Sequence, residues 1–306
     1  MTLANWPIVL IDFAVESLYK MALVVPVVGG AMLVAVVTGG SVRPLLAEGV
    51  RAAVATTLSA LADVPAAFAS FIVALLLVSV GGALLMFLLK AGTLAVLVEG
   101  ERRAPPVERE ALRYGSLARS DAYRLETLLG GVERFGRRMM ALGLWLSGAY
   151  AVLGLGYVAA MTWTVHLSVQ PGFNAAWPLV AATATGSAVA ALALVNLIFD
   201  LMRVVVVCED VGLRRAAARL STFVMRDARR VIGIFAVITG LRVVGAAASL
   251  LFAAGLAIVA WVPVVGLIVV PVQAAAWLLR GLLFQYVSVT AVCAYTAEYR
   301  RFMSGS

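Results

Sequence analysis

The feature that most constrains this chain is a series of long apolar runs, each about as long as a bilayer crossing. A helix needs about 20 mostly apolar residues to cross the hydrocarbon core, and such runs recur between residues 21 and 298. Hydrophobic residues make up 63% of the chain and charged residues 13%, a balance that excludes an ordinary soluble domain. The sequence therefore predicts an all-α polytopic transmembrane bundle that forms one membrane domain over residues 1–306.

The apolar runs predict about six spans. They lie near residues 21–39, 65–98, 139–165, 178–207, 231–260 and 281–297. Residues 7–20 precede the first span and carry Asp12, Glu16 and Lys20 at a spacing of four, which predicts an amphipathic helix on the membrane surface.

The last apolar segment is too long for one crossing and carries helix-breaking residues. Pro263, Pro271 and Arg280 lie within residues 262–297. We expect a broken segment, with an interfacial or re-entrant piece up to Leu279 before the final span. Two complete crossings are the alternative.

Basic residues are concentrated in two connections. Nine arginines lie in residues 99–138 and seven in residues 203–230, whereas residues 41–64 hold two and residues 166–177 hold none. Under the positive-inside rule, this asymmetry predicts a multi-pass protein of the cell (inner) membrane with six spans and both termini in the cytoplasm. The net charge of +8 then favours anionic lipid headgroups, and not nucleic acid, as the counter-charge.

Catalytic and metal-binding motifs are missing from the sequence. There is no Gly-x-Ser-x-Gly, Walker or His-Glu-x-x-His pattern, and His166 is the single histidine. The two cysteines, Cys208 and Cys293, lie near the ends of apolar runs, so we expect no disulfide. We expect no enzyme activity, no catalytic residue, no metal site and no cofactor.

Ionisable residues inside the spans are the first candidate site residues. They are Lys90, Asp200, Arg203, Arg242 and Arg280. A charge in hydrocarbon is costly and usually faces a partner or a cavity. Asp200 and Arg203 are three residues apart and can pair, and Lys90 can reach the basic interface. Arg242 lies about twelve residues past Arg230, roughly 18 Å along a helix, so we expect it to be paired or to face a cavity.

Two sets of arginines before spans are the second candidates. They share one spacing: Arg134, Arg137 and Arg138 in the first connection, and Arg226, Arg229 and Arg230 in the second. Apolar residues interleaved with arginines are typical of helices that lie on anionic membrane or dock to a partner, although topology control alone would also select arginines here. Glycine pairs at 29–30, 39–40 and 81–82 predict close helix packing.

The segment Asn196-Leu-Ile-Phe-Asp-Leu-Met-Arg-Val-Val-Val-Val-Cys-Glu-Asp210 precedes a basic stretch and a new span, and the chain nears its end with Ala294-Tyr-Thr-Ala-Glu-Tyr-Arg-Arg301. These residues resemble a group of bacterial six-helix membrane proteins, whose related domains occur fused to glycerophosphodiester phosphodiesterases. The resemblance covers mainly residues 196–301. It implies a helical membrane domain and transfers no catalytic residue, because the phosphodiesterase barrel is absent.

Three functions compete on this sequence. The first is a non-enzymatic accessory or scaffold subunit whose basic face meets lipid or a protein partner. The second is a transporter or channel for a lipid or small amphiphile that uses the intramembrane charges. The third, a lipid-modifying enzyme, needs an acid–base constellation that the sequence does not supply.

Overall fold

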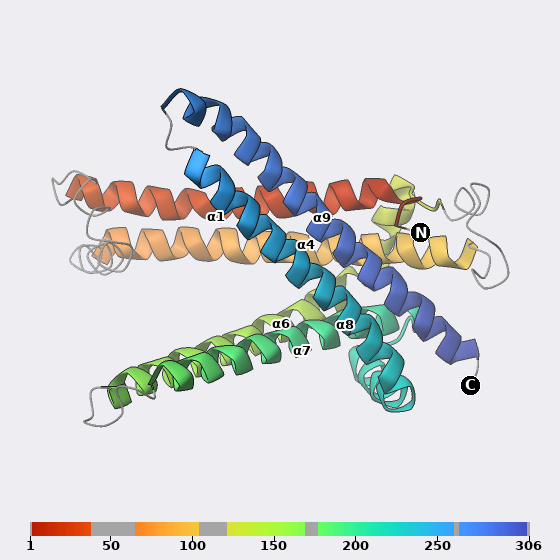
Figure 1. Ribbon diagram of the computed structural model, residues 1–306. Coiled ribbons are helices and arrows are strands. Elements are labelled where there is room, and N and C mark those ends of the chain that lie inside the picture. Colours follow the sequence, from red (N-terminus) through yellow and green to blue (C-terminus); the bar gives the residue numbers. More distant parts are fainter. Residues whose placement is uncertain (1, 38–64, 104–120, 169–176, 260–262, 305–306) are drawn as a thin grey trace. The chain divides into compact units, whose positions relative to one another are not determined.

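The computed structural model describes residues 2–37, 65–103, 121–168, 177–259 and 263–304, and these residues contain helices and no strand. The helices are α1 (Trp6–Val37), α4 (Pro65–Arg103), α6 (Leu125–Ser168), α7 (Trp177–Glu209), α8 (Leu213–Val259) and α9 (Pro263–Ser304) (Figure 1). By length and composition, α4 and α6 to α9 each contain a segment able to cross a membrane. The predicted multi-pass helical class is therefore confirmed.

Two basic stretches continue the membrane helices instead of forming separate elements. Helix α6 begins at Leu125, and α8 begins at Leu213 with a bend at Asp227 (φ −116°, ψ 29°). Helix α7 ends at Glu209, and Asp210 takes a left-handed conformation with φ 54°. Aspartate tolerates this region better than most residues. The turn at Asp210 therefore reverses the chain within three residues, between the end of α7 at Glu209 and the start of α8 at Leu213.

The predicted break in the last apolar segment is wrong. Helix α9 runs without interruption from Pro263 to Ser304, with Pro271 and Arg280 inside it. Pro271 lies in the third helical turn and removes one backbone hydrogen bond, which membrane helices tolerate when neighbouring groups satisfy the freed carbonyl. The predicted final span, residues 281–297, therefore lies within the C-terminal half of a longer helix.

The predicted surface helix and first span are also joined. Helix α1 is continuous from Trp6 to Val37 and includes Pro26. Residues 38 and 39 of the predicted span lie outside the described residues. The surface position of residues 7–20 stays a prediction.

The chain divides into two units, residues 11–86 and residues 1–10 with 87–306. In the first unit, Gly82 lies so close to the Tyr19 ring that no Cβ would fit, and the Tyr19 hydroxyl donates a hydrogen bond to the Ser79 carbonyl (3.4 Å). Gly29 and Gly81 face open space. Of the predicted packing glycines whose surroundings are described, Gly82 alone has close contacts.

In the second unit, α6 packs along α7 and α8 packs along α9, while α7 also contacts both α8 and α9. The two hairpins meet at one end and diverge away from it (Figure 1). Leu201 to Val207 of α7 are buried in succession, as expected for a helix end surrounded by others. The core of this unit therefore lies at the end where the hairpins meet.

Candidate functional site

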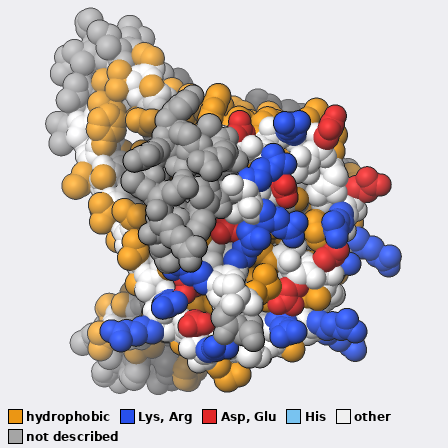
Figure 2. Space-filling view, turned by 90° about the vertical axis from the view of Figure 1, so that its right-hand side faces the viewer, with side chains coloured by type: hydrophobic (Ala, Val, Ile, Leu, Met, Phe, Trp, Pro, Cys, Tyr) orange, Lys and Arg blue, Asp and Glu red, His pale blue; other side chains and the backbone are white. Residues whose placement is uncertain are grey.

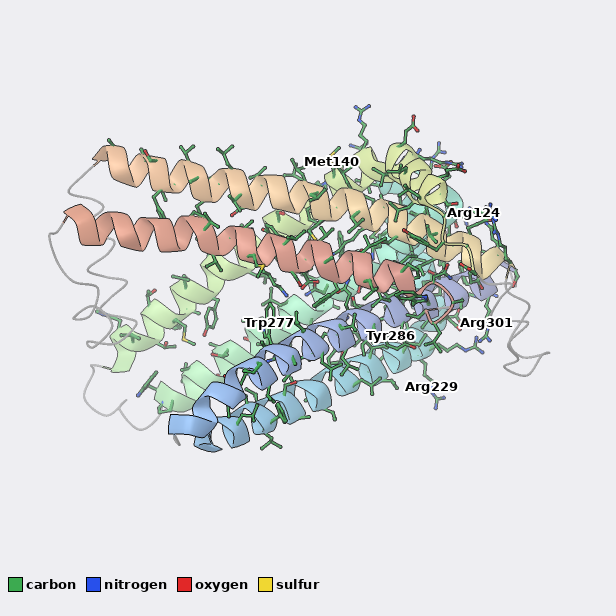
Figure 3. All side chains as sticks on the ribbon, turned by 90° about the horizontal axis from the view of Figure 1, so that it is seen from above. Arg124, Met140, Arg229, Trp277, Tyr286 and Arg301 are labelled. Atoms are coloured by element: carbon green, nitrogen blue, oxygen red, sulfur yellow. The ribbon has the colours of Figure 1, made fainter. Side chains whose placement is uncertain are left out.

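The helix ends that meet in the second unit carry most of its charged side chains, and we call this region the charged end. It comprises Glu99–Arg103 of α4, Leu125–Arg138 of α6, Glu209 and Asp210, Leu213–Arg230 of α8 and Glu298–Arg301 of α9. Basic and acidic side chains alternate over this face (Figure 2). Arg124, Arg229 and Arg301 lie at this end and Trp277 lies well away from it (Figure 3).

Ion pairs and hydrogen bonds at the charged end link α4, α7, α8 and α9 to one another and link α6 to the turn between α7 and α8. Their partners are Arg300 with Glu101, Arg230 with Glu298 (3.0 Å), Arg219 with Glu209 (3.6 Å), Tyr299 with Glu209, and both Arg134 and Arg138 with Asp210. Since sequentially adjacent helices alternate in direction, their charged ends can meet only if the basic connections share one side. The cytoplasmic position of these connections stays a prediction.

Asp210 joins α6 to the α7–α8 turn. It accepts hydrogen bonds from Arg134 Nε (3.1 Å) and from Arg138. Hydrogen bonds from the two guanidinium groups, and their positive charges, hold the pKa of the Asp210 carboxyl below its usual range. The carboxyl is therefore ionised at neutral pH and fixes the turn against α6.

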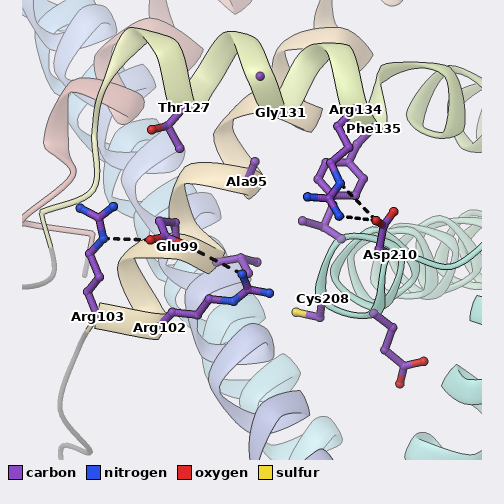
Figure 4. A pocket seen from close by; sticks show the side chains of 14 residues that line it. Ala95, Glu99, Arg102, Arg103, Thr127, Gly131, Arg134, Phe135, Cys208 and Asp210 are labelled. Carbon is purple, nitrogen blue, oxygen red and sulfur yellow. Dashed lines mark hydrogen bonds and ion pairs between the residues drawn. The ribbon is translucent and has the colours of Figure 1, made fainter.

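A crevice of about 680 Å³ opens between the ends of α4, α6 and α7 (Figure 4). Its charged lining residues are Glu99, Arg102, Arg103, Arg134, Glu209 and Asp210, and Cys208 lies beside them. Glu99 pairs with Arg103 (2.9 Å) and approaches Arg102 (4.0 Å). Because each cation faces a carboxylate, the crevice presents both signs of charge, as a zwitterionic or hydrogen-bonding ligand would require.

One wall of the crevice is a close helix crossing. A Cβ at Gly131 of α6 would lie 2.5 Å from the Ala95 Cβ and 3.1 Å from the Gly92 Cα of α4. A Cβ at Gly92 would lie 2.6 Å from the Leu128 carbonyl oxygen. The absence of side chains here lets the two backbones approach, as small residues commonly do in membrane helices.

The first residues of the chain are also part of the charged end. Asn5 is fully buried, and its Oδ1 accepts a hydrogen bond from the Ala122 backbone N–H (3.0 Å) just before α6. Thr2 donates to Cys293 Sγ (3.6 Å) of α9 and accepts from Thr290 (3.2 Å). Thr2 and Asn5 could not be predicted as contact residues from the sequence, because isolated polar residues before a helix form no pattern.

Lys90, Asp200 and Arg203 come together around one aromatic ring. Arg203 pairs with Asp200 at 2.8 Å, as their spacing predicts. The Lys90 ammonium and the Arg203 guanidinium each lie 5.6 Å from the centroid of the Phe199 ring. Arg203 is 6% exposed, and its Nε has no hydrogen-bond partner among the described residues. Asp200 and the ring thus hold a buried cation near the charged end.

Polar side chains continue from this cluster toward the middle of the apolar helices. Asp200 lies close enough to Tyr295 of α9 for an electrostatic interaction, and Arg242 of α8 interacts with the same phenol. On the other side, Tyr150 of α6 donates to Asn196 of α7. Asp200 of α7 and Arg242 of α8 are therefore both electrostatic neighbours of Tyr295 of α9, and the Tyr150–Asn196 bond separately joins α6 to α7.

Arg242 and Arg280 meet at a second, smaller cavity of about 80 Å³ between α8 and α9. Gly245 and Ser249 also line it, with Leu283 and Phe284 opposite. The Arg280 guanidinium lies 5.6 Å from the centroid of the Phe284 ring. The expectation that Arg242 is paired or faces a cavity agrees with this position.

The remaining predicted basic residues lie on the surface of the charged end. Arg226 stacks on Phe302 of α9, with 5.6 Å from its Cζ to the ring centroid. Arg137 and Arg229 are exposed. Their role toward lipid or a partner stays a prediction. In the part of the chain that the structure describes, no three His, Cys, Asp or Glu side chains gather as metal ligands.

Comparison with known proteins adds no assignment to these sites. No family model, curated protein or solved structure matches the chain. The resemblance to the six-helix membrane proteins thus stays a prediction that rests on residues 196–301.

Proposed function

We propose that the chain is a non-enzymatic accessory or scaffold subunit of a membrane complex, placed in a bacterial inner membrane with the charged end in the cytoplasm. The positive-inside rule supports this orientation. The observation that carries the proposal is a contrast within the second unit. Its helices contact one another closely at the charged end, whereas the described residues of this unit leave small-residue surfaces on the apolar halves uncovered.

Most glycines follow this contrast, and Gly130 and Gly212 at the charged end are exceptions with open space around them. At the packed end, Gly92, Gly131 and Gly143 have neighbours where a Cβ would stand. In the apolar halves, by contrast, seven glycines have no atom from elsewhere in the described residues within 4 Å of that position: Gly148, Gly154, Gly156, Gly186, Gly233, Gly240 and Gly255. Small residues give lipid chains little contact, but they let a second helix approach closely. The uncovered glycines therefore favour helices of another subunit as neighbours.

The experiment is native mass spectrometry of the protein extracted gently from its own membrane. We expect a stoichiometric protein partner. A Gly154→Leu substitution should release the partner without unfolding the chain, because leucine blocks a helix approach at that site and meets nothing within the chain. Gly130→Leu is the matched control, since Gly130 also has open space around it but lies at the charged end. A monodisperse chain that never retains a partner would contradict the proposal.

A second candidate function is transport of a lipid or small amphiphile. The neighbouring polar groups from Asp200 through Tyr295 to Arg242 support it, because charges inside spans often line a substrate path. Its test is flux of a labelled amphiphile across liposomes that contain the purified chain. An Arg242→Gln variant should lose this flux, and equal flux in liposomes with and without protein would exclude transport.

A further inference from the structure

The cavity between α8 and α9 brings two cations together without an acidic partner. Arg242 comes from α8 and Arg280 from α9, and the lining contains no Asp or Glu. Neither guanidinium forms an ion pair with a described residue. A single charge in the apolar part of a membrane is costly, and two of the same sign repel each other as well. A bound anion would neutralise both guanidinium groups.

The helix register places both guanidinium groups within reach of one small ligand. Gly245 lies opposite Phe284, with 3.7 Å from the ideal Gly245 Cβ to the ring. Because the helices are antiparallel, Arg242 lies three residues to one side of this level and Arg280 four residues to the other. At 1.5 Å per residue the two backbone positions are about 10 Å apart along the hairpin. The long side chains of Arg242 and Arg280 can span that distance, so that both guanidinium groups reach one ligand in the cavity.

The depth of Arg280 points to the leaflet farther from the charged end. Helix α9 is continuous between Arg280 and Arg300, and these 20 residues span about 30 Å, close to the hydrocarbon thickness. Trp277, one turn away, is 51% exposed, which suits the headgroup level of that leaflet. Arg242 lies deeper and can extend outward toward the same headgroups.

The rim of the cavity is apolar and faces outward. Leu241 and Leu283 are 54% and 56% exposed. The Ser249 hydroxyl donates to the Gly245 carbonyl (2.7 Å) within its own helix, so the guanidinium groups are the donors that remain for a ligand. A volume of about 80 Å³ holds a group of a few oxygen atoms. The ligand thus combines a compact anionic group with a tail that fits an apolar surface.

We propose that Arg242 and Arg280 together bind the anionic headgroup of a lipid that enters from the bilayer, in the leaflet farther from the charged end. The proposal does not rest on the partner surface proposed above, because the cavity lies between α8 and α9 and lipid binding there needs no second protein. A phosphate shared by two guanidinium groups gains charge-assisted hydrogen bonds and neutralises both cations. The lipid chains then cover the exposed leucines at the rim.

The test uses Trp277 as a reporter, because it lies one helical turn from Arg280. The chain has six tryptophans, and the other five are replaced by phenylalanine. This full-length protein is reconstituted in phosphatidylcholine vesicles that contain either brominated phosphatidylglycerol or brominated phosphatidylcholine. We expect Trp277 fluorescence to be quenched at a roughly 25-fold lower fraction of the anionic lipid, since two arginines each contribute about fivefold.

Variants separate the site from general attraction to charge. Arg242→Gln and Arg280→Gln should each reduce the preference for the anionic lipid about fivefold. Arg280→Lys, which keeps the charge, should retain most of it and guards against misfolding of the glutamine variants. Arg229→Gln at the charged end is the control and should change nothing, because Arg229 is exposed and remote.

Three results would overturn the proposal. Equal quenching by the two brominated lipids would show that the cavity does not select an anion. A preference that survives in the double glutamine variant would place the anion elsewhere. Loss of the preference on addition of inorganic phosphate would identify a free anion, and not a lipid headgroup, as the ligand.

Discussion

Replacing Gly131 by alanine should force α6 and α4 apart. The new Cβ would lie 2.5 Å from the Ala95 Cβ, 3.1 Å from the Gly92 Cα and 3.3 Å from the Ala91 carbonyl oxygen. All three atoms belong to the backbone or Cβ positions of α4, so no side-chain rotation can relieve the contact (Figure 4). The helices must separate by several tenths of an ångström or more.

The change in the free energy of unfolding has two opposing contributions. Forcing an extra methyl group into a filled contact costs about 1–3 kcal/mol. Alanine in place of glycine in a helix recovers up to about 1 kcal/mol. Gly130 is the matched position, because it is on the same helix turn and its ideal Cβ has no atom within 4 Å. Gly130→Ala should therefore be the more stable of the two variants by about 1–3 kcal/mol.

The measurement is reversible unfolding of both variants in mixed micelles of increasing sodium dodecyl sulfate content, followed by circular dichroism. Comparing the two alanine variants with each other cancels the change in helix propensity. If Gly131→Ala equals or exceeds Gly130→Ala in stability, the α4–α6 crossing is not as close as described.

Three further predictions concern polar contacts. Asp210→Asn should lower the thermal midpoint by no more than about 2 °C at neutral pH, because its contacts with two arginines are solvent-screened. Since the folded-state pKa of this carboxyl is depressed, the difference from wild type should vanish as the pH falls through that pKa, as a pH series of melting curves would show. Asp200→Asn should cost about 3–5 kcal/mol in the same detergent titration, because it leaves the buried Arg203 cation without its carboxylate. An unchanged midpoint would mean that the pair contributes nothing. Tyr299→Phe should cost about 1.5–3 kcal/mol through the lost hydrogen bond to Glu209, and a Tyr299→Phe protein as stable as wild type would contradict that bond.

Several elements could be predicted because they depend on local properties. Apolar length placed the segments of α4 and α7 within a few residues, whereas α6 and α8 begin 14 and 18 residues before the predicted spans because the basic stretches continue them. The spacing of Asp200 and Arg203 predicted their ion pair, because residues three apart share a helix face whatever surrounds the helix. The break predicted before Gly281 failed, because proline and arginine weaken a helix locally but do not decide whether its neighbours sustain it.

The sequence by itself determined the helical membrane class and the concentration of arginines in two connections, because transfer from water to lipid depends on each residue's own chemistry. Only the tertiary structure decided that Gly131 meets Gly92, that Asp210 holds α6, and that Arg242 meets Arg280. In lipid the hydrophobic effect does not select among helix pairs, so shape and polar contacts select them. Those contacts join residues far apart in the chain, and no local spacing records them.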